Sequence, residues 1–202
     1  MAHELGFYVA FGVGATLVVT AEPGRALIAT LIFSTSGAAC FGASALYHRP
    51  TWAPGVRAWL ARLDHACVYL LIAGTYTPFA LIVMSPGWAA VVLSVVWGGA
   101  ATATAAKLLW LRAPKWLSAV IGVALGWSGV IALPELLTIP AMGLGLVFTG
   151  GVLYTCGAIV YIRRSPDPVP HLFGYHELFH VLTLFAAASH YAAVAFFVLP
   201  RA

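Results

Sequence analysis

Two histidines and a glutamate near the C-terminus have the spacing of a metal-dependent hydrolase. Residues 174–180 read GYHELFH, so His176, Glu177 and His180 form the pattern H-E-x-x-H. In zinc metalloproteases this pattern places two imidazoles one helical turn apart, with the glutamate as general base. The residues after His180 fit neither the gluzincin nor the metzincin continuation, and no Asp or Glu follows Glu177. We therefore do not interpret the motif as that of a protease, and we keep only its two histidines as candidate metal ligands. We expect Glu177, which lies about 100° round the helix from His176, to point elsewhere.

Ser44, His48 and Asp64, from earlier parts of the chain, could supply the third metal ligand and the polar groups that this histidine pair lacks. Ser44 and His48 are four residues apart, so one helix presents a hydroxyl one turn from an imidazole. Catalytic zinc favours histidine nitrogens, with three protein ligands and one position left for water. The sequence thus predicts a zinc site made of His48, His176 and His180. Zinc lowers the pKa of water to about 7, so Asp64 is expected to accept or relay the proton. Ser44 is expected to help stabilise the oxyanion that forms when the zinc-bound hydroxide attacks a carbonyl group.

The remaining histidines are interpreted as interfacial or hydrogen-bonded groups, which is the common role of a histidine near a helix end. They are His3, His65, His171 and His190. Ten helical residues separate His190 from His180, a distance of about 15 Å, so His190 is too far away to share the metal.

These polar groups occur in a chain whose composition suits lipid rather than water. Hydrophobic residues make up 62% of the chain and charged residues 8%, against about 25% charged residues in soluble domains. A spanning helix needs about 20 mostly apolar residues. We predict an all-α integral membrane protein, with residues 1–202 forming one seven-helix domain. The predicted spans are approximately 5–21, 26–47, 63–84, 88–106, 116–134, 141–163 and 175–199.

The basic residues predict the orientation of the bundle. Cytoplasmic loops are enriched in Lys and Arg. Eight basic residues share one side with the N-terminus: Arg49, Arg57, Arg62, Lys107, Arg112, Lys115, Arg163 and Arg164. Only Arg25 and Arg201 lie on the other side. The N-terminus is therefore expected in the cytoplasm and the C-terminus outside. The net charge of +4 is attributed to the loops, so no nucleic-acid partner is expected.

That orientation brings the chemical groups of three spans to one depth. Ser44 and His48 end the second span, Asp64 begins the third, and the histidine pair begins the seventh, all on the cytoplasmic side. Ionisable groups within membrane helices are costly and mark functional sites. A separate motif, Gly122-x-x-x-Gly126, permits close helix packing. We favour packing within the bundle and keep a homo-oligomer as the alternative.

Three segments of the chain resemble the hemolysin III proteins of bacteria, which belong to the wider progestin and adipoQ receptor family that includes the adiponectin receptors. The segments are RLDHACVYLLIAGTYTPF, GGVLYTCGAIVY and FGYHELFHVL. The resemblance implies a seven-helix protein of the bacterial inner membrane with a cytoplasmic N-terminus. It also implies zinc held by three histidines, and ceramidase-like hydrolysis of a lipid amide.

Three functions remain open from the sequence. The first is a zinc-dependent hydrolase of a lipid amide or ester in the cytoplasmic leaflet. The second is a non-catalytic sensor or regulator of membrane fluidity or energetics. Three histidine ligands argue against it, because structural zinc sites have four protein ligands. The third is a haemolytic pore, although no continuous polar stripe runs through any predicted span.

Overall fold

The computed structural model describes residues 2–48, 51–110, 114–169 and 171–202, with the side chains of all of these except residues 2, 3 and 115. Arg49 and Arg112 lie outside the described residues. The described chain is helical, without a β-strand, and has one isolated bridge between Val169 and Phe173. Its α-helices are α1 (Ala2–Thr20), α2 (Arg25–His48), α3 (Pro54–Pro78), α4 (Pro86–Leu109), α5 (Lys115–Trp127), α6 (Leu133–Leu136), α7 (Ala141–Arg163) and α8 (Tyr175–Ala193).

Within the described residues, six segments are long and apolar enough to cross a membrane, and the first of the seven predicted spans corresponds to α1, a shorter apolar helix. The six are Arg25–His48, Pro54–Val83, Pro86–Leu109, Trp116–Leu136, Ala141–Arg163 and Tyr175–Arg201. Short π-helical or 3₁₀ turns extend three of them: Phe79–Val83 after α3, Ser128–Ala132 between α5 and α6, and Val194–Val198 after α8. The predicted membrane-spanning helical bundle is confirmed. The side of the membrane that each end faces stays a prediction from loop charge.

The third span differs from its prediction at its start. The sequence predicted a span beginning at residue 63 after a polar connection, but α3 begins at Pro54. Proline is well tolerated in the first helical turn. Hydropathy misses this segment because it carries arginines, one of which, Arg62, lies 5.0 Å from the Trp59 ring. Asp64 is consequently about 15 Å along α3 from the helix start.

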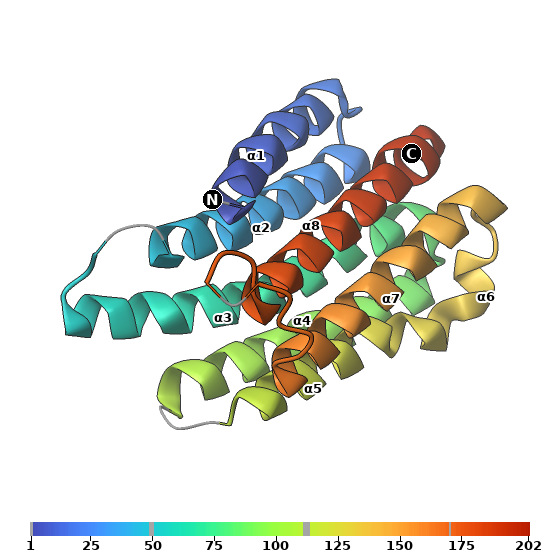
Figure 1. The fold of residues 1–202 in the computed structure, drawn as a ribbon. Helices are drawn as coiled ribbons and strands as arrows, with labels where there is room; N and C mark the ends of the chain where they lie inside the picture. Colours follow the sequence, from blue (N-terminus) through green and yellow to red (C-terminus); the bar gives the residue numbers. More distant parts are fainter. Residues whose placement is uncertain (1, 49–50, 111–113, 170) are drawn as a thin grey trace.

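The contacts between the helices form a closed ring. Neighbours along the chain pair as α1 with α2, α2 with α3, α3 with α4, and α7 with α8 (Figure 1). Helix α5 packs against α3, α4 and α7, and α1 contacts α8, which completes the ring. Between α2 and α3 the approach is close, because a Cβ added at Gly74 would lie 1.9 Å from the Ser36 hydroxyl oxygen.

The largest apolar core lies away from the predicted histidine site. It joins the second half of α3, the middle of α4 and the π-helical turn after α8, and includes Phe79, Val96, Val194 and Val198, all nearly or fully buried. A smaller buried cluster formed by Cys40, Ala43, Cys67 and Leu71 lies nearer to the histidines.

Candidate metal centre and lipid-sized cavity

The start of α8 is fixed by two carboxylates close in sequence. The Gly174 N–H donates to Glu177 Oε2 at 3.0 Å, and the Tyr175 N–H donates to Asp167 Oδ1 at 2.8 Å. Both contacts satisfy N–H groups that a helix start leaves without partners, and negative charge is favourable there. Glu177 is exposed and acts as a helix cap. This contact agrees with the expectation that its carboxylate points away from the metal-facing side that includes His176.

Helices α2 and α8 bring three imidazoles together at one end of the bundle. His176 Nε2 lies 2.9 Å from His180 Nε2 and 3.4 Å from His48 Nε2. The possible ligand atoms of all three lie within 4.8 Å of one another. The side chains pass from the surface inward, because His48 is exposed, His176 half-buried and His180 buried. The predicted convergence of the second and seventh spans is therefore present in the fold.

The donor set and its spacing fit a tetrahedral metal. Zinc–nitrogen bonds of about 2.05 Å at a tetrahedral angle place two ligand nitrogens about 3.3 Å apart. Two of the separations in the cluster, 2.9 and 3.4 Å, are close to that value. Three protein nitrogens also leave one coordination position for water or substrate. The cluster can hold a metal ion, and binding of zinc stays a prediction.

Asp64 and Ser44 lie beside the imidazoles and contact each other. A side-chain hydrogen bond joins the Ser44 hydroxyl to the Asp64 carboxylate, and that carboxylate interacts electrostatically with His48. The Asp64 side chain is 16% exposed, and Ser44 is 1% exposed. An almost buried hydroxyl therefore orients a carboxylate that still reaches the surface of the site. The structure brings both predicted residues to the cluster, and their roles in catalysis stay predictions.

His65 is a neighbour of the site rather than a member of the imidazole cluster. Its Nδ1 lies 2.5 Å from the Ala61 carbonyl oxygen and 3.7 Å from Asp64 Oδ2. Because a carbonyl only accepts, Nδ1 carries the proton, and Nε2 is left to pair with the Tyr161 hydroxyl at 3.3 Å. The interpretation of His65 as a hydrogen-bonded histidine is confirmed.

The other histidines are also separate from the cluster. His190 lies in the interior of the bundle, where its Nε2 donates to the Val147 carbonyl oxygen at 3.0 Å. His171 is exposed in the loop before α8. The side chain of His3 is outside the described part of the chain. His190 is thus a hydrogen-bonded group in the last turn of α8, as interpreted from the sequence.

A cavity of about 670 Å³ opens from the histidine cluster into the bundle. Its described lining comes from α2, α3, α5, α7 and α8 and from the turns around α6, and includes no residue of α1 or α4. Along α3 the lining extends from Asp64 to Phe79, a length of about 22 Å. Beyond the polar groups at the cluster the walls are mainly aliphatic and aromatic. The volume falls within the usual 300–1,000 Å³ of small-molecule sites, and the length and apolarity suit a lipid chain.

The G-x-x-x-G motif faces this cavity. Gly122 and Gly126 both line it. A Cβ at Gly122 would lie 3.9 Å from Ile72 and Tyr69 of α3, and one at Gly126 would meet open space. The lack of a side chain at these two glycines therefore makes room inside the bundle. The close helix contact expected from the motif is not present at either position, because an added Cβ would meet ordinary contact at Gly122 and open space at Gly126.

Sequence reasoning missed two tyrosines of α7 that line the cavity and did not identify His190 as a lining residue. Tyr154 and Tyr161 line the cavity from α7. They are seven residues apart and so lie on one helix face. That spacing was the available signal, but apolar periodicity alone does not separate a cavity-lining tyrosine from one in a packed core.

The fold and site together define a class: multi-pass helical membrane proteins with a three-histidine cluster at one end of an apolar cavity. Comparison with protein families gives the particular group. The model of the family described as "Haemolysin-III related" matches residues 1–191, and the chain belongs to that family. The resemblance seen in the sequence motifs is therefore confirmed.

Similarity to individual proteins extends from bacteria to plants. The chain is 29% identical to "Hemolysin-3" of Bacillus cereus over 214 residues, covering 99% of this chain and 94% of the relative. It is 30% identical to "Hemolysin-3 homolog" of Bacillus subtilis (strain 168), covering 85% and 78% respectively. "Heptahelical transmembrane protein ADIPOR1" of Oryza sativa subsp. japonica is 29% identical, with 82% of this chain and 47% of the relative covered. These matches connect the chain to the wider group that includes the adiponectin receptors.

Proposed function

We propose that this chain is a zinc-dependent hydrolase of the bacterial inner membrane that cleaves an amide or ester bond of a lipid, in the manner of a ceramidase. The observation that carries the proposal is the junction between the histidine cluster and the apolar cavity. A lipid chain lying in the cavity would present its carbonyl carbon beside His176 and His180. The basic loops predict that this end faces the cytoplasmic leaflet.

The residues around the cluster can divide the chemistry between them. When bound, zinc would supply Lewis-acid activation of water and of the carbonyl oxygen. The Asp64 carboxylate accepts a proton from the attacking water and returns it to the nitrogen or oxygen of the leaving group. Ser44 holds that carboxylate through its hydrogen bond, so that one carboxylate oxygen is oriented toward the water. The apolar walls exclude bulk water and position the chain.

Asp64→Asn separates hydrolysis from metal binding. Purified protein is loaded with zinc, its metal content is measured per chain, and it is offered labelled ceramides with other lipid amides and esters. We expect product from the wild type and a loss of about 10²–10⁴-fold in turnover for Asp64→Asn, with zinc retained, because the amide cannot take up the proton. Glu177→Gln, which changes a carboxylate on the adjoining helix cap, is the matched control and should keep its turnover.

The outcomes separate the candidate functions. Zinc bound without turnover on a broad panel of lipids would replace the hydrolase with the alternative of a membrane sensor or regulator. Loss of turnover in Glu177→Gln but not in Asp64→Asn would restore the H-E-x-x-H interpretation. A wild type that binds no zinc would overturn the metal site.

A further inference from the structure

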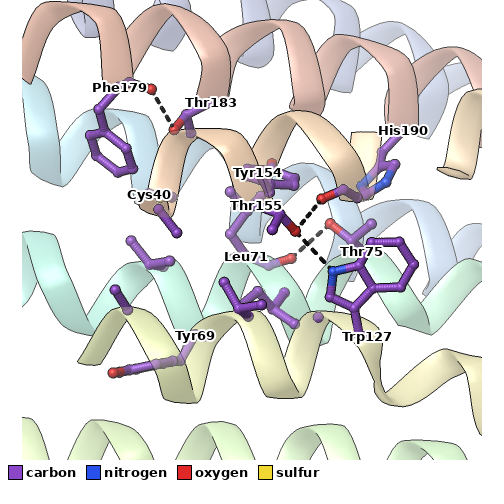
Figure 2. A pocket seen from close by; sticks show the side chains of 18 of the residues that line it. Cys40, Tyr69, Leu71, Thr75, Trp127, Tyr154, Thr155, Phe179, Thr183 and His190 are labelled. Carbon is purple, nitrogen blue, oxygen red and sulfur yellow. Dashed lines mark hydrogen bonds between the residues drawn. The ribbon is translucent and has the colours of Figure 1, made fainter. Parts of the chain in front are cut away.

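A second polar position lies inside the apolar part of the cavity. His190 and Tyr154 face each other from α8 and α7, with ring centroids 5.6 Å apart (Figure 2). Both line the cavity. Ten residues of α8 separate His190 from His180, so this position is about 15 Å from the histidine cluster. It is therefore distinct from the candidate metal centre.

Within the described chain, only His190 Nδ1 and the Tyr154 hydroxyl are buried side-chain polar atoms without a hydrogen-bond partner. The polar groups near them differ. Thr75 donates to the Leu71 carbonyl oxygen, and Thr155 accepts from Trp127 while donating to a backbone carbonyl, as Figure 2 shows. Buried polar groups are normally paired, because leaving one unpaired costs free energy. The two exceptions therefore point to a partner that enters the cavity.

The surrounding structure determines what that partner must offer. His190 Nε2 donates to the Val147 carbonyl oxygen, so Nδ1 of the neutral ring is an acceptor. The ring cannot easily turn away, since it lies so close to α7 that a Cβ at Gly150 would be 2.3 Å from it. The Tyr154 hydroxyl can donate. A single group that donates to the imidazole and accepts from the phenol satisfies both atoms, and a hydroxyl does this whereas a carbonyl does not.

We propose that Tyr154 and His190 form a subsite for a hydroxyl carried part-way along a lipid chain, about 15 Å from the group held at the histidine cluster. The ligand class is a hydroxylated acyl chain. The inference shares with the proposed function the binding of a lipid chain in the cavity, and it does not require hydrolysis.

A binding competition tests the subsite without turnover. Purified protein is equilibrated with a fluorescent fatty acid, which is displaced by stearic acid or by hydroxystearic acids whose hydroxyl moves stepwise along the chain. We expect isomers with the hydroxyl far from the carboxylate to compete about two- to tenfold better than stearic acid, the gain of one neutral hydrogen-bond set. Isomers hydroxylated next to the carboxylate should compete like stearic acid.

Two variants and a control locate the preference. Tyr154→Phe removes only the hydroxyl, and His190→Gln keeps a donor for the Val147 carbonyl but has no acceptor at the position of Nδ1. In both variants, all hydroxystearic acid isomers and stearic acid should displace the fluorescent fatty acid equally well. Thr75→Val is the matched control, since its hydroxyl lines the same cavity but is already bonded to Leu71, and it should keep the preference. If His190→Gln does not fold, Tyr154→Phe decides alone.

Two results would overturn the subsite. One is equal competition by every isomer in the wild type, which would mean that water alone satisfies the two atoms. The other is a preference that persists in Tyr154→Phe. In either case competition by stearic acid itself would leave the proposed hydrolase intact, whereas absence of turnover with a clear hydroxyl preference would leave the subsite intact.

Discussion

Replacing His176 with alanine is expected to remove zinc binding without unfolding the bundle. His176 has the central nitrogen of the cluster, 2.9 Å from that of His180 and 3.4 Å from that of His48. The side chain is half-buried at the cavity mouth, so its truncation leaves the core of α3, α4 and α8 untouched. Loss of one of three nitrogens is therefore a local change with a large effect on the metal.

The magnitude follows from the number of ligands. Structural zinc sites with four protein ligands have apparent binding free energies of about 10–16 kcal/mol. An equal share is roughly 2.5–4 kcal/mol per ligand, which corresponds to a loss of about 100- to 1000-fold in affinity. Zinc per chain after dialysis against a chelator of intermediate affinity should fall from near one to near zero. His171→Ala, which removes an exposed histidine from the loop before α8, is the matched control and should keep its zinc.

Thermal unfolding gives a second readout of the same change. Zinc held by the histidines of α2 and α8 would stabilise the folded state by about 2.7 kcal/mol at a free concentration 100 times Kd. For a chain of this size that corresponds to roughly 5–10 °C in Tm. Chelation should lower the Tm of the wild type and of His171→Ala, and it should leave His176→Ala unchanged. Full zinc content in His176→Ala, or an equal loss in both variants, would refute the assignment of the site.

Further variants test the supporting contacts. Glu177→Gln should lower stability by about 1 kcal/mol or less through its weakened helix cap, measured as a small fall in Tm at constant zinc content. Ser44→Ala should reduce turnover about tenfold with zinc retained, since Asp64 loses the hydroxyl that orients it, and unchanged turnover would show that the hydrogen bond is not needed. Gly74→Ala should destabilise the protein by about 1–3 kcal/mol, because the new methyl group meets a serine of α2. Gly98→Ala, at a helix position with nothing within 4 Å, should be neutral or stabilising in the same unfolding assay.

The regular features of the fold follow from local sequence. Apolar runs of about 20 residues in a chain that is 8% charged predict membrane helices, because a lipid core requires every backbone group to bond within its own segment. The Pro-Gly turns predict where runs end. The same reasoning missed the first turns of α3, since a helix that continues past the apolar run carries charges that a hydropathy measure treats as loop.

The site was partly predictable for a related reason. Helical spacing alone puts His176 and His180 on one face, and alternation of spans alone puts His48 at the same depth. Depth, however, does not give the distance between α2 and α8 around the ring. That distance is set by how the intervening helices pack, and it decides whether three imidazoles meet.

The sequence by itself determined the helical membrane class, the family motifs and the identity of the groups that could bind a metal. Only the tertiary structure decided that the imidazoles meet, that Ser44 bonds Asp64, and that Glu177 caps α8. It also decided the cavity and the place of Tyr154 and His190 within it. The physical reason is that each spacing along one helix is fixed by backbone geometry. A space between helices, by contrast, depends on the side chains that every neighbour does or does not contribute, as the glycines of α5 show.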